Sequence, residues 1–165
     1  MERVLVIAYG NPLRSDDGIA WQAAAALHRE LPSSVRIMCV HQLTPDLAED
    51  VSLADVIIFL DASTNGKPGA VHCETVFAKP LEPHSFHHLS PAEVLAMGAC
   101  LYSVKPRGFL VSVDGECFDH GQGLSPSAIH AVPQVVAHVH SLIRNLNRAV
   151  GMRDLSTLRS ETYAL

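Results

Sequence analysis

The chain has 165 residues, of which 48% are hydrophobic and 18% are charged, and its formal net charge is −5. This length is typical of one domain that buries about two-thirds of its chain surface around a single core. The negative charge argues against a broad surface for nucleic acid or for an anionic membrane.

No apolar run in the sequence approaches the roughly 18 residues of a membrane span. The apolar run near the N-terminus, residues 4–8, is also too brief for a secretory signal, so we expect a cytoplasmic protein. The cysteines lack Cys-x-x-Cys spacing, which disfavours a zinc site or a redox pair. They are predicted to be buried free thiols: Cys39, Cys73, Cys100 and Cys117.

The first two predicted elements are joined by a turn that is rich in glycine and aspartate. Residues 4–8 are predicted to form a strand that is buried on both faces, and residues 17–29 a helix. Between them the sequence reads Gly10-Asn-Pro-Leu-Arg-Ser-Asp-Asp-Gly18. Open α/β sheets place ligands at such strand-to-helix turns, so this stretch is the first candidate for a functional site.

Two interpretations of this turn stand side by side. Ser15 or Asp16 could cap the helix, and the positive end of the helix dipole would stabilise carboxylates in its first turn. Alternatively, Asp16 and Asp17 could bind a cation or act in acid–base chemistry. A nucleotide loop is disfavoured, because the glycine spacing differs from Gly-x-Gly-x-x-Gly and the carboxylates would repel phosphates.

The next elements predict a parallel sheet. Strands are predicted at residues 35–40 and 56–60, with a short helix between them that continues to Leu53. Thr44 is predicted to cap this helix, with Pro45 at its first position. Because strands and helices alternate, right-handed crossovers should join parallel strands.

The second half of the chain completes the sheet. Residues 70–77 follow the third strand too closely for a parallel crossover and are predicted to form an antiparallel edge strand. A helix is expected from Ser90 to Tyr102, with Pro91 and Glu93 completing its cap. A last strand at residues 109–113 is followed by a long helix that starts at Leu124-Ser125-Pro126.

The predicted fold is therefore a single three-layer α/β domain. Its sheet has five strands and is mostly parallel, with one antiparallel edge strand and helices on both faces. The domain occupies residues 1–150. Residues 151–165 lack a clear apolar period and are predicted to form a C-terminal tail that is flexible.

Potential ligands follow several strands of this sheet. Asp17 follows the first strand, His41 the second and Asp61 the third, and His87 and His88 lie in the loop before the third helix. The carboxyl ends of neighbouring parallel strands share one crevice. Carboxylates and an imidazole brought together there would suit a divalent transition metal with open coordination positions.

Four motifs also occur in a particular order along the chain. They are Gly10–Gly18, Asp61-Ala62 at a strand end, His87–Pro91 before a helix and Cys117–Ser125 before the last helix. In this order they resemble the nickel-iron hydrogenase maturation endopeptidases, over residues 4–147. The resemblance implies that residues 1–150 are a domain of that kind.

The resemblance also implies an activity and a set of site residues. Asp17, Asp61 and His87 correspond by position to the family's metal ligands, with His87 preferred to His88. The implied reaction removes a short C-terminal extension from a nickel-loaded hydrogenase large-subunit precursor. Nickel would arrive in the precursor, and no organic cofactor is expected. Asp16 or Asp17 would act as a general base near the metal.

Further residues are implied to bind the substrate. They are Gly10 and Asn11 of the first motif and His41, Gln42 and Thr44 of the loop after the second strand. The partner would be the hydrogenase large-subunit precursor, with no nucleic acid or membrane, and the enzyme is expected to be a monomer. Two alternatives remain: a non-catalytic nickel chaperone or sensor with the same ligands, and a Rossmann-type small-molecule binder, against which the missing phosphate loop argues.

Overall fold

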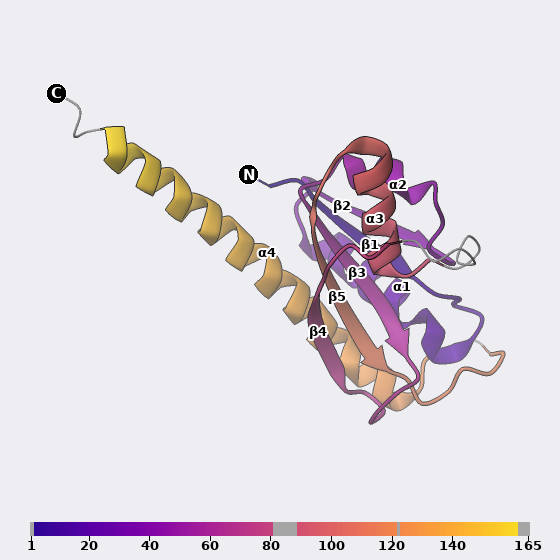
Figure 1. The fold of residues 1–165 in the computed structure, drawn as a ribbon. Coiled ribbons are helices and arrows are strands. Elements are labelled where there is room, and N and C mark those ends of the chain that lie inside the picture. The colour runs from indigo at the N-terminus through magenta and orange to yellow at the C-terminus, as the bar shows by residue number, and fades with distance from the viewer. Residues whose placement is uncertain (1, 81–88, 122, 162–165) are drawn as a thin grey trace.

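The protein contains one five-stranded sheet with helices on both faces (Figure 1). The structure is a computed structural model that describes residues 2–80, 89–121 and 123–161, without the side chains of residues 149–161. The strands are β1 (Val4–Tyr9), β2 (Val35–Val40), β3 (Val56–Ser63), β4 (Val71–Val76) and β5 (Arg107–Asp114).

The order of the strands in the sheet is β2-β1-β3-β5-β4. All neighbouring pairs are parallel except β4 and β5, which are antiparallel, so β4 is the antiparallel edge strand that the sequence predicted. The chain leaves β1 for β2 on one side and returns to β3 on the other. The loops after β1 and β3 therefore border the crevice where open sheets bind ligands.

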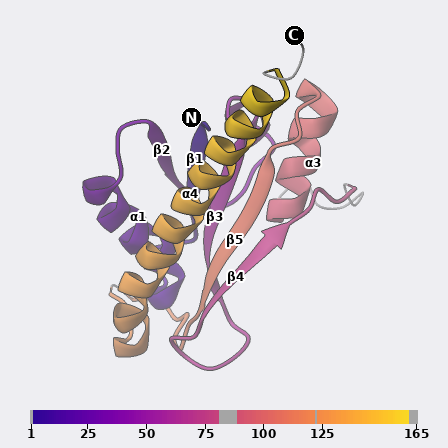
Figure 2. The ribbon, with the colours of Figure 1, turned by 90° about the vertical axis from the view of Figure 1, so that its left-hand side faces the viewer.

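The helices form two layers around the sheet (Figures 1 and 2). On one face lie α1 (Ile19–Glu30) and α4 (Pro126–Glu161), and on the other lie α2 (Leu47–Ser52) and α3 (Pro91–Tyr102). A short 3₁₀ turn, η1 (Ser15–Gly18), precedes α1. This arrangement confirms the predicted fold class.

Strand β1 shows why both faces are covered. Val4, Val6 and Ala8 pack into the core beneath α1 and α4, whereas Leu5 and Ile7 pack into the core beneath α2 and α3. Successive side chains of a strand point to opposite faces. Burying an aliphatic side chain of this size contributes about 1.5–3 kcal/mol, so the continuous apolar sequence holds both helical layers to the sheet.

Several predicted boundaries differ from the structure by a few residues, and two of the differences concern predicted site residues. Strand β3 passes through Asp61 and ends at Ser63, because its pairing with β5 continues as far as Asp114. Helix α2 begins only at Leu47, and Thr44 is not its cap. Instead the Thr44 carbonyl accepts a hydrogen bond from the Leu47 N–H (3.2 Å) in the turn before the helix.

The cap of α3 is as predicted. The Ser90 hydroxyl accepts from the Glu93 N–H at 3.3 Å, and the Glu93 carboxylate accepts from the Ser90 N–H at 2.8 Å. Such a reciprocal box satisfies two backbone donors at the start of a helix. It fixes where α3 begins after the preceding loop.

Helix α4 is longer than the sequence indicated. It runs over 36 residues to Glu161, with Pro133 inside it, and its C-terminal half extends away from the sheet (Figure 1). Residues 151–161 are therefore helical, and the flexibility of the C-terminal tail stays a prediction. No helix among the described residues is long and apolar enough to cross a bilayer.

The prediction that the cysteines are buried is wrong for three of them. Cys39, Cys73 and Cys100 are exposed, and Cys117 is partly buried. Cys39 and Cys73 lie on β2 and β4, the two edge strands of the sheet. Edge strands have neighbours on one side only, so an apolar residue there is covered less than the pattern of a central strand suggests.

Candidate active site

The turn after β1 folds back on itself. Gly10 has a φ of +134°, and a Cβ atom there would lie 2.2 Å from the Asp17 carbonyl oxygen. Only glycine fits such a position. The Asn11 N–H donates to Asp17 Oδ2 at 2.8 Å. The close approach of the two ends of the turn thus sets the position of the Asp17 carboxylate.

The prediction that Ser15 or Asp16 caps the following helix is wrong. The residue at the cap of α1 is Gly18, without a side-chain hydrogen bond, because the 3₁₀ turn η1 lies between the strand and the helix. Ser15 has a φ of +47°, and its hydroxyl donates to the Asp119 carbonyl at 3.2 Å. Helix capping therefore does not explain the presence of Asp16 and Asp17 in this turn.

Asp16 is fully buried and saturated with hydrogen bonds. Its carboxylate accepts from the N–H groups of Glu116 (2.7 Å), Cys117 (3.1 Å) and Ser125 (2.7 Å), and from the Ser125 hydroxyl (2.7 Å). Burial alone would raise the pKa of Asp16, but these donors hold the pKa below its usual value. Asp16 therefore anchors the segment before α4 to the turn after β1.

That segment, residues 115–121 and 123–125, is called the clasp loop here. Its backbone also pairs with the turn: the Ser15 N–H donates to the Gly121 carbonyl at 3.1 Å, and the Gly121 N–H donates to the Leu13 carbonyl at 3.0 Å. The Arg14 Nε donates to the Phe118 carbonyl at 3.2 Å. The first and last sequence motifs thus form one structural unit.

Asp17 and Asp61 lie near each other at the end of the sheet. The Tyr9 hydroxyl donates to Asp61 Oδ2 at 2.5 Å, and the Ala62 N–H donates to Asp61 Oδ1 at 2.8 Å. Burial raises the pKa of Asp61 to about 6; the two donors oppose this rise, and the negative charge of Asp17 adds to it. Like charges in one crevice destabilise each other, and a bound cation would relieve the repulsion.

Tyr9 was missed by the sequence analysis. It follows Leu5 and Ile7 at the spacing of one strand face, and it packs against the core beneath α2 and α3. Its position on that face, at the end of β1, could have placed it beside a residue at the end of β3. Burial, the Asp61 charge and their hydrogen bond raise the pKa of Tyr9, so it stays a neutral donor.

The predicted histidines are distributed differently. His41 is exposed, and its ring lies 5.3 Å from that of Trp21, measured between centroids, at an interplanar angle of 36°. His87 and His88 lie outside the described residues. Leu89, which follows them, donates its N–H to the Leu43 carbonyl at 3.3 Å, in the loop that carries His41.

Within the described part of the chain, no three His, Cys, Asp or Glu side chains are grouped to hold a metal. The structure brings together two members of the predicted set, Asp17 and Asp61. The third member, His87, is one of the residues whose position is not described. The predicted metal set therefore stays a prediction.

Comparison with solved structures identifies the fold. The chain is similar to hydrogenase maturating endopeptidase HybD from E. coli, with 25% identity, a TM-score of 0.72, and coverage of 87% of this chain and 93% of that one. The chain has the fold of the NiFe hydrogenase maturation proteases. No protein-family model and no curated protein matches the sequence.

Two maturation proteases from Thermococcus kodakarensis share this fold. HybD from Thermococcus kodakarensis is 23% identical, with a TM-score of 0.62 over 85% of this chain and 98% of that chain. HycI from Thermococcus kodakarensis KOD1 is 16% identical, with a TM-score of 0.70 over 87% of this chain and 93% of that chain. At these identities the agreement concerns the fold, and the matched structures span nearly the whole domain.

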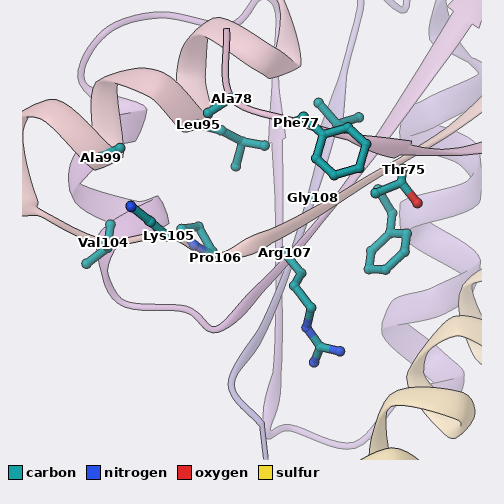
Figure 3. A pocket seen from close by; sticks show the side chains of 12 residues that line it. Thr75, Phe77, Ala78, Leu95, Ala99, Val104, Lys105, Pro106, Arg107 and Gly108 are labelled. Carbon is teal, nitrogen blue, oxygen red and sulfur yellow. The ribbon is translucent and has the colours of Figure 1, made fainter.

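A cleft elsewhere on this maturation-protease fold is apolar (Figure 3). It has a volume of about 410 Å³ and lies at the start of β5, bordered by Leu95 of α3 and by Phe77, which is 78% exposed. Its lining contains no Asp, Glu, His or Cys. Asp61 aligns with Ser112 near the other end of β5, so this cleft is separate from the carboxylate pair.

Proposed function

We propose that the protein is an endopeptidase that removes a short C-terminal extension from a nickel-loaded NiFe hydrogenase large-subunit precursor. The observation that carries this proposal is the proximity of the Asp17 and Asp61 carboxylates in the crevice between β1 and β3. The support from comparison is the fold shared with hydrogenase maturation proteases. The substrate would be a protein, and the metal would arrive as part of it.

In this proposal Asp17, Asp61 and His87 bind the nickel of the precursor. Asp17 accepts one described hydrogen bond through Oδ2, and Asp61 accepts one on each oxygen. A carboxylate has about four lone-pair positions, so both retain capacity for a metal. Nickel can polarise a scissile carbonyl or lower the pKa of bound water. The protein's own contribution is to place oxygen ligands around the ion.

The choice of general base narrows to one of the two predicted aspartates. Asp16 is enclosed by four hydrogen bonds and has no exposed surface, so it has no path to a reacting water. Asp17 remains a proposed proton acceptor. It is also a proposed ligand, and a carboxylate that binds a metal is a weaker base, so these two roles compete.

The residues proposed to contact the substrate lie in the loops that follow β1 and β2. Gly10 and Asn11 form the turn over Asp17, and His41, Gln42 and Thr44 lie in the loop after β2. His41 and Gln42 are exposed and Thr44 is partly buried. Exposed polar side chains in a loop at the carboxyl end of the sheet are suited to contact an incoming peptide.

The test is to incubate the protein with nickel-loaded precursor and, separately, with nickel-free precursor, and to measure the mass of the large subunit. We expect a C-terminal peptide to be lost from the loaded form only. A protein that binds the loaded precursor without shortening it would be a nickel chaperone or sensor instead. Cleavage of both forms would contradict the role of nickel.

The two adjacent histidines can be distinguished by substitution. His87→Ala is expected to abolish processing of nickel-loaded precursor, because it removes a proposed ligand, whereas His88→Ala should keep substantial activity. Circular dichroism would confirm that both variants are folded. If His88→Ala is the inactive variant, the assignment of the ligand shifts by one residue.

A further inference from the structure

Another carboxylate, that of Asp114, pairs with His72 at the end of the sheet where Asp17 and Asp61 lie. Asp114, the last residue of β5, is 2% exposed, and its Oδ2 accepts from Nε2 of His72 on β4 at 2.7 Å. The His72 side chain is 56% exposed. The pair therefore joins a buried carboxylate to an imidazole that solvent can reach.

The surroundings of Asp114 hold this carboxylate in place. Gly66 has a φ of +136°, and a Cβ atom there would lie 2.3 Å from Asp114 Oδ2. The Asp114 N–H donates to the Ala70 carbonyl at 2.9 Å, and the Gly69 N–H donates to the Asp114 carbonyl at 2.7 Å. The turn between β3 and β4 thus closes over Asp114. Its Oδ1 is buried without a hydrogen-bond partner among the described residues.

The pair lies on the same face of the sheet as Asp61. In the register of the sheet, Ser112 of β5 is opposite Asp61 on one side and opposite His72 on the other. Val111 and Val113 point into the core beneath α1 and α4, so Ser112 points to the opposite face, and its direct neighbours do too. Two strand spacings place the Cα atoms of Asp61 and His72 roughly 10 Å apart, with Ser112 between them.

The hydrogen bond to Asp114 determines what His72 can do. A carboxylate accepts, so the Nε2 atom of His72 carries the proton that it donates to Asp114. In the neutral ring the other nitrogen, Nδ1, then has a free lone pair and can accept a proton. A carboxylate that fixes the orientation and tautomer of an imidazole is the arrangement that hydrolases with a Ser-His-Asp triad use for proton transfer.

We propose that His72 is the proton acceptor in peptide hydrolysis and that Asp114 is its positioning residue. This inference rests on the proposed function, and it leaves Asp17 free to act as a metal ligand. As a water oxygen bonds to the scissile carbonyl carbon, one water proton moves to His72 Nδ1. The carbon–nitrogen bond then breaks, and the departing amine takes that proton from His72, which returns to its neutral form.

The test compares His72→Gln with a matched control, His140→Gln. His140 also pairs with a carboxylate, Glu30, at 2.9 Å, but it lies on α4, on the other face of the sheet. With saturating nickel-loaded precursor, we expect kcat of His72→Gln to fall by about 10²-fold or more with KM unchanged, the usual effect of losing a general base. The control should keep the wild-type kcat.

The outcomes separate this inference from the proposed function. If the wild-type protein does not cut nickel-loaded precursor, the proposed function fails first. If the wild type cuts the precursor, the role of His72 can be judged from the folded His72→Gln variant. That role is overturned if the kcat of the variant is within about threefold of the wild-type kcat, or if only KM changes. Folded Asp114→Asn should also lower kcat at constant KM. A change in its thermal stability alone would make Asp114 merely structural.

Discussion

Asp16 and Asp17 are adjacent in the sequence but belong to two different regions of the molecule. Asp16 lies beneath the clasp loop, where it has no exposed surface and four hydrogen bonds. Asp17 lies in the crevice between β1 and β3, partly buried, with the charge of Asp61 nearby. The hydrogen-bond donors around a carboxylate, and not its place in a motif, thus decide whether it is structural or available for chemistry.

The two regions also shift pKa values in opposite directions. Donors in the clasp loop hold the pKa of Asp16 below its usual value, whereas burial and the Asp17 charge raise the pKa of Asp61 to about 6. A carboxylate with a raised pKa is one whose charge the fold does not fully stabilise. Such groups are common in functional sites.

The largest effect is expected from Asp17→Asn and Asp61→Asn. Each substitution removes the charge of a proposed oxygen ligand, so processing of nickel-loaded precursor should fall by about 10²-fold or more. Asp119→Asn is the control, because Asp119 is exposed on the clasp loop. Rates would be measured from the mass of the large subunit over time. A folded Asp17→Asn variant with the wild-type rate would contradict the separation of the two regions.

Asp16→Asn should act on stability. An asparagine presents an amide N–H₂ where the carboxylate accepts, so buried donors lose their partners, at a cost of about 3 kcal/mol. Urea unfolding would measure this loss, with Asp119→Asn again as the control. An unfolding free energy equal to that of the wild type would show that the clasp loop does not depend on Asp16.

Asp61 should make stability depend on pH. Its pKa is about 6 in the folded, metal-free protein and 3.8 as its ordinary value, so the folded state binds the proton more tightly. The stability that this adds is full below pH 3.8 and is lost as the pH rises through about 6. From about pH 4 to about pH 7.5, the unfolding free energy of Asp61→Asn should therefore increase relative to the wild type, by on the order of 1–3 kcal/mol.

Urea unfolding of both proteins at the two pH values checks this prediction. Taking the difference between the variant and the wild type removes the contribution of the titrating groups that do not interact with Asp61. A difference that stays constant with pH would mean that burial does not raise the pKa of Asp61 in the crevice. A difference of the opposite sign would mean that hydrogen bonds dominate there, as they do around Asp16.

The smallest effect is expected from Tyr9→Phe. The Tyr9 hydroxyl donates to Asp61 at 2.5 Å, and this donation lowers the pKa of Asp61. Its loss should raise that pKa further and cost about 1 kcal/mol of stability. The carboxyl carbon chemical shift of Asp61, followed by NMR against pH, would report the change. An unchanged titration would remove Tyr9 from the site.

Much of the fold could be predicted from local patterns. The apolar alternation and run lengths predict five strands, and the short connection before Val71 predicts the antiparallel edge. The cap at Ser90 was readable because all of its parts lie within four residues. The position of Asp61 at the crevice was also readable, since it follows a buried apolar run, residues 56–60, that pairs with parallel neighbours.

The missing parts depend on contacts between distant segments. The donors to Asp16 lie about 100 residues further along the chain, at Glu116, Cys117 and Ser125, so the two aspartates appear equivalent in the sequence. Likewise, His72 and Asp114 meet only through the pairing of β4 with β5. In the sequence Asp114 follows an apolar run, residues 109–113, much as Asp61 follows residues 56–60, and that similarity was the available signal.

Nickel-dependent cleavage is proposed to depend on the Asp17 carboxylate in the crevice and not on Asp16 beneath the clasp loop. The most direct measurement incubates nickel-loaded precursor with Asp16→Asn and with Asp17→Asn, side by side, at a temperature where both are folded, and follows the mass of the large subunit. We expect Asp16→Asn to remove the C-terminal peptide at a substantial rate and Asp17→Asn to leave the precursor intact. An active Asp17→Asn beside an inactive, folded Asp16→Asn would contradict this proposal.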